Sequence, residues 1–167
     1  MTTLADKIMT IDASLDRAGL DHAFGGALAL ALHVEEPRAT RGPVVRHRPG
    51  SGDHDGQIRL FWDDTPVDLF LSTHAFHTEA RAHTTKVPFA GATIPVLGAT
   101  ELAVFKGFFS RTKDWANIEA MIEVGSVDTH RALGWLVDLL GAADERVTHF
   151  TAPLDHQRNA NPTFGSP

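Results

Sequence analysis

The sequence predicts an α+β domain with a small mixed or antiparallel sheet flanked by helices. Apolar residues recur at helical spacing near the N-terminus, short apolar runs alternate with turn residues between positions 57 and 97, and helical periodicity returns after Thr100. The 167 residues can bury a core of their own, so we expect a single domain over residues 1–150. The pattern fades after Val147, and we expect a poorly ordered tail over 151–167.

Composition narrows the class of protein. The net charge of −6 argues against unspecific coating of nucleic acid. The absence of cysteine excludes disulfides, thiolate catalysis and cysteine-ligated zinc. No apolar run approaches the roughly 20 residues that span a bilayer, and the N-terminal stretch lacks the apolar core of a signal peptide. We therefore expect a cytoplasmic protein that does not contact membranes.

The first expected element is an amphipathic helix over residues 3–18 that ends near Gly19. Its apolar residues recur at spacings of three and four: Leu4, Ile8, Ile11 and Leu15. The run 20–24 is short enough for a strand.

Gly25 and Gly26 separate this expected strand from an Ala/Leu run over 27–33, which favours a helix. Glycines at a strand-to-helix turn let backbone N–H groups approach an anion near the helix N-terminus. The same pair can also form a tight turn that binds nothing. Both interpretations stay open from the sequence.

Residues 35–57 are rich in proline and glycine, and we expect a loop with at most one short edge strand. The segment carries a basic cluster that could bind phosphate or be a solvated loop: Arg38, Arg41, Arg46, His47 and Arg48. Asp53 and Asp55 lie near its end.

A β-hairpin is expected next, with strands over 57–63 and 66–72. Asp68 lies within the second strand among apolar residues. A buried ionised carboxylate costs several kcal/mol unless it is paired, hydrogen-bonded or bound to a metal. Asp68 is therefore the first candidate site residue.

The region after the hairpin is expected to be a loop that holds His74, His77 and His83. The His-x-x-His spacing suggests a metal, but no helical pattern supports this, and ordinary loop histidines are the alternative. Two short strands are expected around Gly91, over 87–89 and 93–97.

Three helices are expected in the C-terminal half. The first starts at Thr100 and breaks near Ser110, and the second is expected to be capped by Thr112 with Asp114 in its first turn. The third starts at Asp128 and is closed by Gly141.

Four blocks of this sequence, in this order, resemble nucleotidyltransferase-fold proteins of the DNA polymerase β-like superfamily. They are Phe24-Gly25-Gly26 before the Ala/Leu helix together with 37–41, then Pro66-Val67-Asp68-Leu69-Phe70, then 101–106 and 111–115. The last two resemble the helical motifs of the abortive-infection branch, whose members include toxins of toxin–antitoxin systems. The resemblance covers roughly residues 15 to 125.

This resemblance implies transfer of a nucleoside monophosphate from an NTP to a hydroxyl of an RNA or protein acceptor, with Mg²⁺ bound by carboxylates. It implies that Gly25, Gly26, Lys106 and Arg111 bind the nucleotide and that Asp68 binds the metal. It further implies catalytic roles for Asp68, Lys113 and Asp114, in which Asp114 orients Lys113 or the metal shell. An antitoxin-like protein is an implied partner.

The sequence departs from the family at its metal-binding pair. An Asp-x-Asp strand is expected directly after residues 37–41, but Gly42-Pro43-Val44 stands there, and Asn117 occupies a position where another aspartate is common. Asp53 and Asp55 have the right spacing at a different place and are candidate metal ligands. Two functions therefore stay open: an active transferase, and a catalytically inactive protein of this fold that binds nucleotide, RNA or a protein partner.

Overall fold

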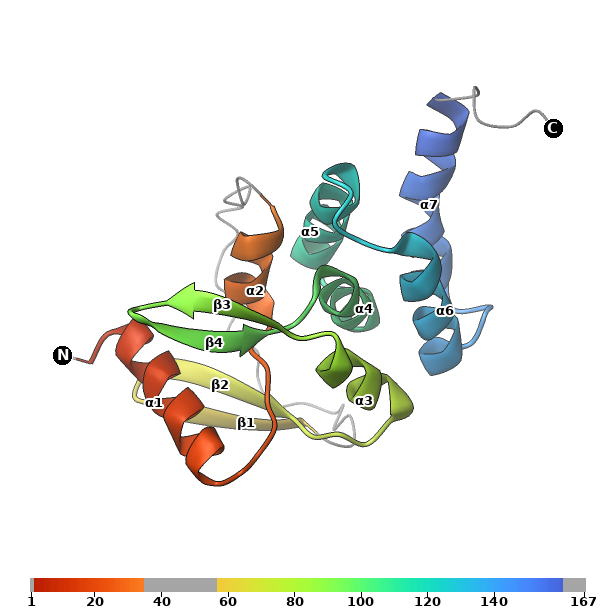
Figure 1. Ribbon diagram of the computed structural model, residues 1–167. Coiled ribbons are helices and arrows are strands. Elements are labelled where there is room, and N and C mark those ends of the chain that lie inside the picture. Colours follow the sequence, from red (N-terminus) through yellow and green to blue (C-terminus); the bar gives the residue numbers. More distant parts are fainter. Residues whose placement is uncertain (1, 35–56, 161–167) are drawn as a thin grey trace. The chain divides into compact units, whose positions relative to one another are not determined.

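The computed structural model describes the backbone of residues 2–34 and 57–160. Over these residues the chain forms seven helices and two separate antiparallel sheets of two strands each (Figure 1). The prediction of an α+β protein with antiparallel pairing is confirmed at this level. No helix in the described ranges is both long and apolar enough to cross a membrane.

The chain divides into two compact units. The first holds the described residues of Met1–Gly25 and Pro43–Gly98, and the second those of Gly26–Gly42 and Ala99–Pro167. Two compact units can belong to one domain, so the expected single domain over 1–150 stays a prediction.

The first unit begins with α1 (Leu4–Arg17), which confirms the predicted amphipathic helix. Thr3 starts the helix with a capping box, because its hydroxyl accepts a bond from the Asp6 N–H at 3.1 Å while the Asp6 carboxylate accepts the Thr3 N–H at 2.9 Å. Gly19, with φ of 68°, follows the helix end.

The strand predicted over 20–24 is wrong except at its last residue. Phe24 alone pairs with the sheet, by donating its N–H to the Pro95 carbonyl at 2.8 Å and accepting the Leu97 N–H at 2.9 Å. This single bridge joins the segment to Val96 in parallel.

The predicted hairpin is confirmed as β1 (Gln57–Trp62) and β2 (Thr65–Phe70), joined by a two-residue turn. Asp63 supplies the positive φ, 52°, that such turns require. Lys7 of α1 contacts both sides of this turn, because its buried ammonium donates hydrogen bonds to the Trp62 carbonyl at 2.8 Å and to the Thr65 hydroxyl at 3.0 Å. The contact places α1 beside the hairpin (Figure 1).

The loop predicted around the histidines is wrong, because α3 (Ala75–Ala82) occupies it. His74 caps the helix by accepting the Phe76 N–H at Nδ1, 3.1 Å, and His77 Nδ1 accepts the N–H groups of Thr73 and His74. The strands β3 (Thr85–Phe89) and β4 (Ala92–Val96) then form the second predicted hairpin, with Gly91 in its turn.

The second unit consists of helices. It holds α2 (Gly26–His33), α4 (Ala99–Phe109), α5 (Thr112–Glu123), α6 (Thr129–Leu140) and α7 (Glu145–Ala160). Helix α4 is central, because it contacts each of the other four (Figure 1). Its buried face meets a core that includes Ile118, Met121, Leu136 and Phe150.

The helix ends of this unit test the predicted caps. The helix predicted from Asp128 begins one residue later, at Thr129, and Asp128 caps it by accepting the Arg131 N–H at 3.0 Å; Gly141 follows its last residue, as predicted. The predicted Thr112 cap is wrong: Arg111 is the N-cap of α5, without a side-chain capping bond, and Thr112 is the first helical residue. Helix α7 continues to Ala160, through ten residues of the segment for which we expected a poorly ordered tail.

Candidate functional site

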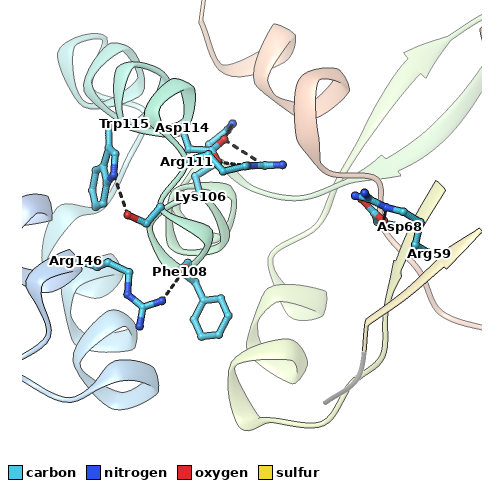
Figure 2. A network of polar contacts seen from close by, with 9 residues as sticks. Arg59, Asp68, Lys106, Phe108, Arg111, Asp114, Trp115 and Arg146 are labelled. Carbon is cyan, nitrogen blue, oxygen red and sulfur yellow. Dashed lines mark hydrogen bonds and ion pairs between the residues drawn. The ribbon is translucent and has the colours of Figure 1, made fainter. Parts of the chain in front are cut away.

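The structure gathers three of the predicted site residues at the corner between α4 and α5 (Figure 2). Lys106 lies in the last turn of α4, Arg111 is the N-cap of α5, and Asp114 lies in the first turn of α5. We call these three residues the α4–α5 cluster. Asp68 lies in the other unit, and Asp53 and Asp55 lie outside the described residues.

The corner itself is tightly built. Ser110 turns the chain with φ of 53°, and its N–H donates to the Lys106 carbonyl at 2.9 Å. The Ser110 hydroxyl accepts the indole N–H of Trp115 at 3.1 Å (Figure 2). These bonds fix the angle at which the side chains of α4 meet the first turn of α5.

Asp114 is the centre of the α4–α5 cluster and is fully buried, with 0% of its surface exposed. Lys106, itself buried, donates from Nζ to Asp114 Oδ1 at 2.9 Å. Arg111 donates from Nε to Asp114 Oδ2 at 2.5 Å. Both carboxylate oxygens thus have cationic partners, which is what a buried charge requires.

These partners also set the titration of Asp114. Burial alone would raise the pKa of Asp114, but the hydrogen bonds from Arg111 and Lys106 and their positive charges outweigh it and hold the pKa below the ordinary aspartate value. The carboxylate is therefore ionised at neutral pH. One negative and two positive charges leave the cluster with a net positive charge.

Arg111 carries that positive charge to the surface, because 57% of its side chain is exposed. Asp114 holds it at Nε, and its guanidinium lies over the Phe109 ring, 5.9 Å from the ring centroid. The guanidinium is thus oriented yet accessible. A planar, oriented guanidinium suits the recognition of phosphate oxygens.

Lys113 differs from Asp114, the next residue of α5. It is exposed, and the structure gives it no ion pair with any described residue. The observed partners of the Asp114 carboxylate are Lys106 and Arg111, and a role of Asp114 in orienting Lys113 or the metal shell stays a prediction.

Asp68 is not the buried carboxylate that the sequence suggested. Its side chain is 28% exposed, and both oxygens face the guanidinium of Arg59, at 2.5 Å from Nε and 2.6 Å from Nη2 (Figure 2). The pairing register explains this, because Arg59 and Asp68 lie opposite each other on β1 and β2.

This pairing bears on Mg²⁺. A two-metal site needs several carboxylates with oxygens available to the ions. In the described ranges, no three histidine, aspartate or glutamate side chains are grouped so that they could hold a metal, and Asp68 is engaged by Arg59. The described residues therefore do not fit a two-metal site.

The two glycines of the predicted phosphate turn have local reasons to be glycine. Gly26 has φ of 65°, a conformation that side chains rarely adopt, and it is the first residue of α2. A Cβ on Gly25 would lie 3.1 Å from the Leu97 side chain. A tight turn accounts for both residues, and phosphate binding at this turn stays a prediction.

Two arginines that matter here were missed from the sequence. Arg59 could have been identified as the partner of Asp68 by pairing the two strands residue by residue outward from the Asp63–Asp64 turn. Arg146 donates to the Phe108 carbonyl at 2.7 Å and pairs with Asp144, so it closes the C-terminal end of α4 (Figure 2). No local pattern predicts that long-range contact.

A comparison with the known protein families finds no match to this chain, and a search among curated proteins finds none either.

Proposed function

We propose that the protein is a nucleotidyltransferase-like protein that binds a nucleoside triphosphate, with Arg111 as a direct phosphate contact. The observation that supports this best is the α4–α5 cluster, in which a buried carboxylate orients an exposed guanidinium. Lys106 has a different role in this proposal. It is buried and donates its hydrogen bond to Asp114, so it holds the carboxylate in place and adds positive charge to the cluster without contacting the ligand.

The helix geometry adds to this support. The N-terminus of α5 carries the partial positive charge of its unsatisfied N–H groups, and Arg111 stands at that end. An anion bound to Arg111 would be stabilised by the guanidinium and by the partial positive charge of the helix N-terminus. These two features support the proposal of an anionic ligand, such as a triphosphate, over an uncharged one at this corner.

Transfer of the nucleoside monophosphate to an RNA or protein acceptor is the second candidate function. The four sequence blocks support it, and Asp68, Asp53 and Asp55 would be its metal ligands. The Arg59–Asp68 pair argues for binding without transfer, because a metal would have to displace a guanidinium that contacts both carboxylate oxygens.

Binding is tested by titrating the purified chain with each of the four NTPs in a calorimeter. Replacing Arg111 with alanine should weaken binding by about 10- to 100-fold, the effect of losing a charge-assisted hydrogen bond. Arg111→Lys keeps the charge without the fork and should recover part of the affinity. Arg17→Ala, at an exposed arginine in the last turn of α1, is the control and should change nothing.

Transfer is tested by incubating the chain with Mg²⁺, labelled NTPs and RNA or protein acceptors. Labelling that disappears in Asp68→Asn would establish the second candidate function. Binding that depends on Arg111 without any labelling would establish the first. Equal affinities of the native chain and Arg111→Ala would contradict the assignment of Arg111.

A further inference from the structure

A histidine–aspartate pair in the first unit has no part in the proposed site. His22 Nε2 lies 2.9 Å from Asp12 Oδ1. The two side chains are only 12% and 10% exposed. The other ring nitrogen, Nδ1, lies 3.0 Å from the Leu20 carbonyl oxygen and 4.0 Å from Asp16 Oδ1.

The partners of the ring determine its protonation state. A neutral imidazole has one N–H, whereas both ring nitrogens of His22 face oxygens that can only accept a hydrogen bond. The imidazolium satisfies both. Neither nitrogen is left over for a substrate, so this pair is not arranged as a catalytic base.

The charged groups around the ring are acidic. Asp12 and Asp16, both from α1, face the ring nitrogens, and the Phe24 ring packs edge-on at 5.7 Å between centroids. The neighbouring Asp21 pairs with Arg81 of α3. Among the described residues, no cation pairs with Asp12 or Asp16 in place of the imidazolium.

The pair lies where the chain leaves α1 for the sheet. Two residues after His22, Phe24 makes the only bridge of its segment to β4, through the 2.8 Å bond to Pro95 and the 2.9 Å bond from Leu97. Gly25 follows directly. The attachment of this segment therefore rests on this backbone bridge, on the His22–Asp12 contact and on the exposed Asp21–Arg81 ion pair.

We infer that His22 and Asp12 form a proton-dependent clamp that holds segment 20–25 against α1, supports the neighbouring Phe24 bridge to β4, and weakens when the imidazolium loses its proton. This inference goes beyond the proposed function and does not depend on it. Deprotonation removes the positive charge beside the Asp12 carboxylate and leaves one of the two ring nitrogens facing an oxygen without a hydrogen between them, so the contact between the segment and α1 is weakened.

The direction of the pH dependence follows from the surroundings of the ring. Burial would lower the pKa of His22, but the hydrogen bonds to Asp12 and Leu20 and the charges of Asp12 and Asp16 outweigh it, so the pKa lies above the ordinary histidine value. The clamp is therefore fully closed below the pKa of unfolded histidine, about 6.5. It weakens as the pH rises through the higher pKa of the folded chain.

The test is an NMR titration of the full chain without nucleotide, with His22 assigned by comparison with His22→Gln. His22 should titrate above the ordinary histidine range, and Asp12→Asn should lower its pKa. Hydrogen-exchange protection of the Phe24 and Leu97 amides should fall as the pH rises through that pKa. The fall should approach tenfold for each unit by which the pKa exceeds that of the unfolded chain.

His130→Gln is the matched control, because His130 is exposed on α6 in the other unit. It should leave the titration of His22 and both protection factors unchanged. The inference is overturned if His22 titrates at or below the ordinary value, or if both amides keep the same protection factor across its titration. Asp12→Asn provides this readout even where His22→Gln does not fold.

Discussion

Asp68 and Asp114 are both aspartates held by an arginine, yet they occupy opposite kinds of environment. Asp114 is fully buried and contacts two cations, whereas Asp68 is 28% exposed and, in the pairing seen on β1–β2, contacts Arg59. The sequence suggests the reverse, since Asp68 stands in an apolar strand and Asp114 in a polar stretch. Burial is set by what packs around a residue in space, and the apolar character of its sequence neighbours does not determine it.

The largest effect is expected from Asp114→Ala. It leaves the buried ammonium of Lys106 without its partner, and breaking a buried pair in this way costs about 3–5 kcal/mol of the free energy of unfolding. Urea denaturation followed by circular dichroism measures it. Lys113→Ala, one residue earlier and exposed, should stay within about 0.5 kcal/mol. A loss below about 1 kcal/mol for Asp114→Ala would show that the pair does not need its charges matched.

A double variant separates charge from packing. Lys106→Met with Asp114→Leu removes both buried charges at once, and apolar replacement of a buried pair is often neutral or stabilising. It should therefore be clearly more stable than Asp114→Ala. If the two variants unfold at the same urea concentration, the contribution of Asp114 comes from starting α5 and not from pairing with Lys106.

Acid should act on Asp114 in a defined direction. Because its folded pKa is below the ordinary value of about 3.9, its contribution is present above that pH and is lost as the pH falls through the folded pKa. The stability of Asp114→Asn should depend less on pH in this range. Asp144, whose pKa Arg146 lowers to about 2, titrates in the same direction, so Asp144→Asn is needed to separate the two.

The smallest effect is expected at the hairpin. Replacing Arg59 with alanine or Asp68 with asparagine should cost less than about 1 kcal/mol, the usual value for a solvated cross-strand ion pair. A double-mutant cycle on the two residues gives the coupling energy directly. A coupling above about 2 kcal/mol would place Asp68 in the same class as Asp114 and remove the contrast between them.

Local patterns predicted most of the elements. The signals that predicted them act within a few residues, so they are readable from the sequence. Examples are the four apolar residues at helical spacing in α1, the start of α6 just after Asp128 and its end at Gly141, and the turn before Thr65. The α+β class followed from the same signals. Of the candidate site, the proximity of Lys106, Arg111 and Asp114 could be predicted, because they lie within nine positions across one helix break.

Each wrong prediction has a physical cause. Helix α3 has only one large apolar residue, Phe76, and its capping depends on imidazole nitrogens that substitute for the usual hydroxyl or carboxylate caps. The short attachment of 20–24 depends on a partner strand far along the chain, because Phe24 pairs with Val96, 72 residues away, and no local pattern indicates this. The partner of Asp68 likewise depends on strand register. Whether the Asp53 and Asp55 carboxylates approach a metal lies outside the described residues.

The lysines of this chain can report chemically on each of the two units. There are four, and each unit has one buried and one exposed: Lys7 and Lys86 in the first, Lys106 and Lys113 in the second. An amine-reactive label should modify Lys86 and Lys113 at once. Lys7 should react only when α1 leaves the β1–β2 turn, and Lys106 only when the α4–α5 corner opens. Mass spectrometry of the labelled peptides would thus time the opening of each unit separately, in the native sequence and without any substitution.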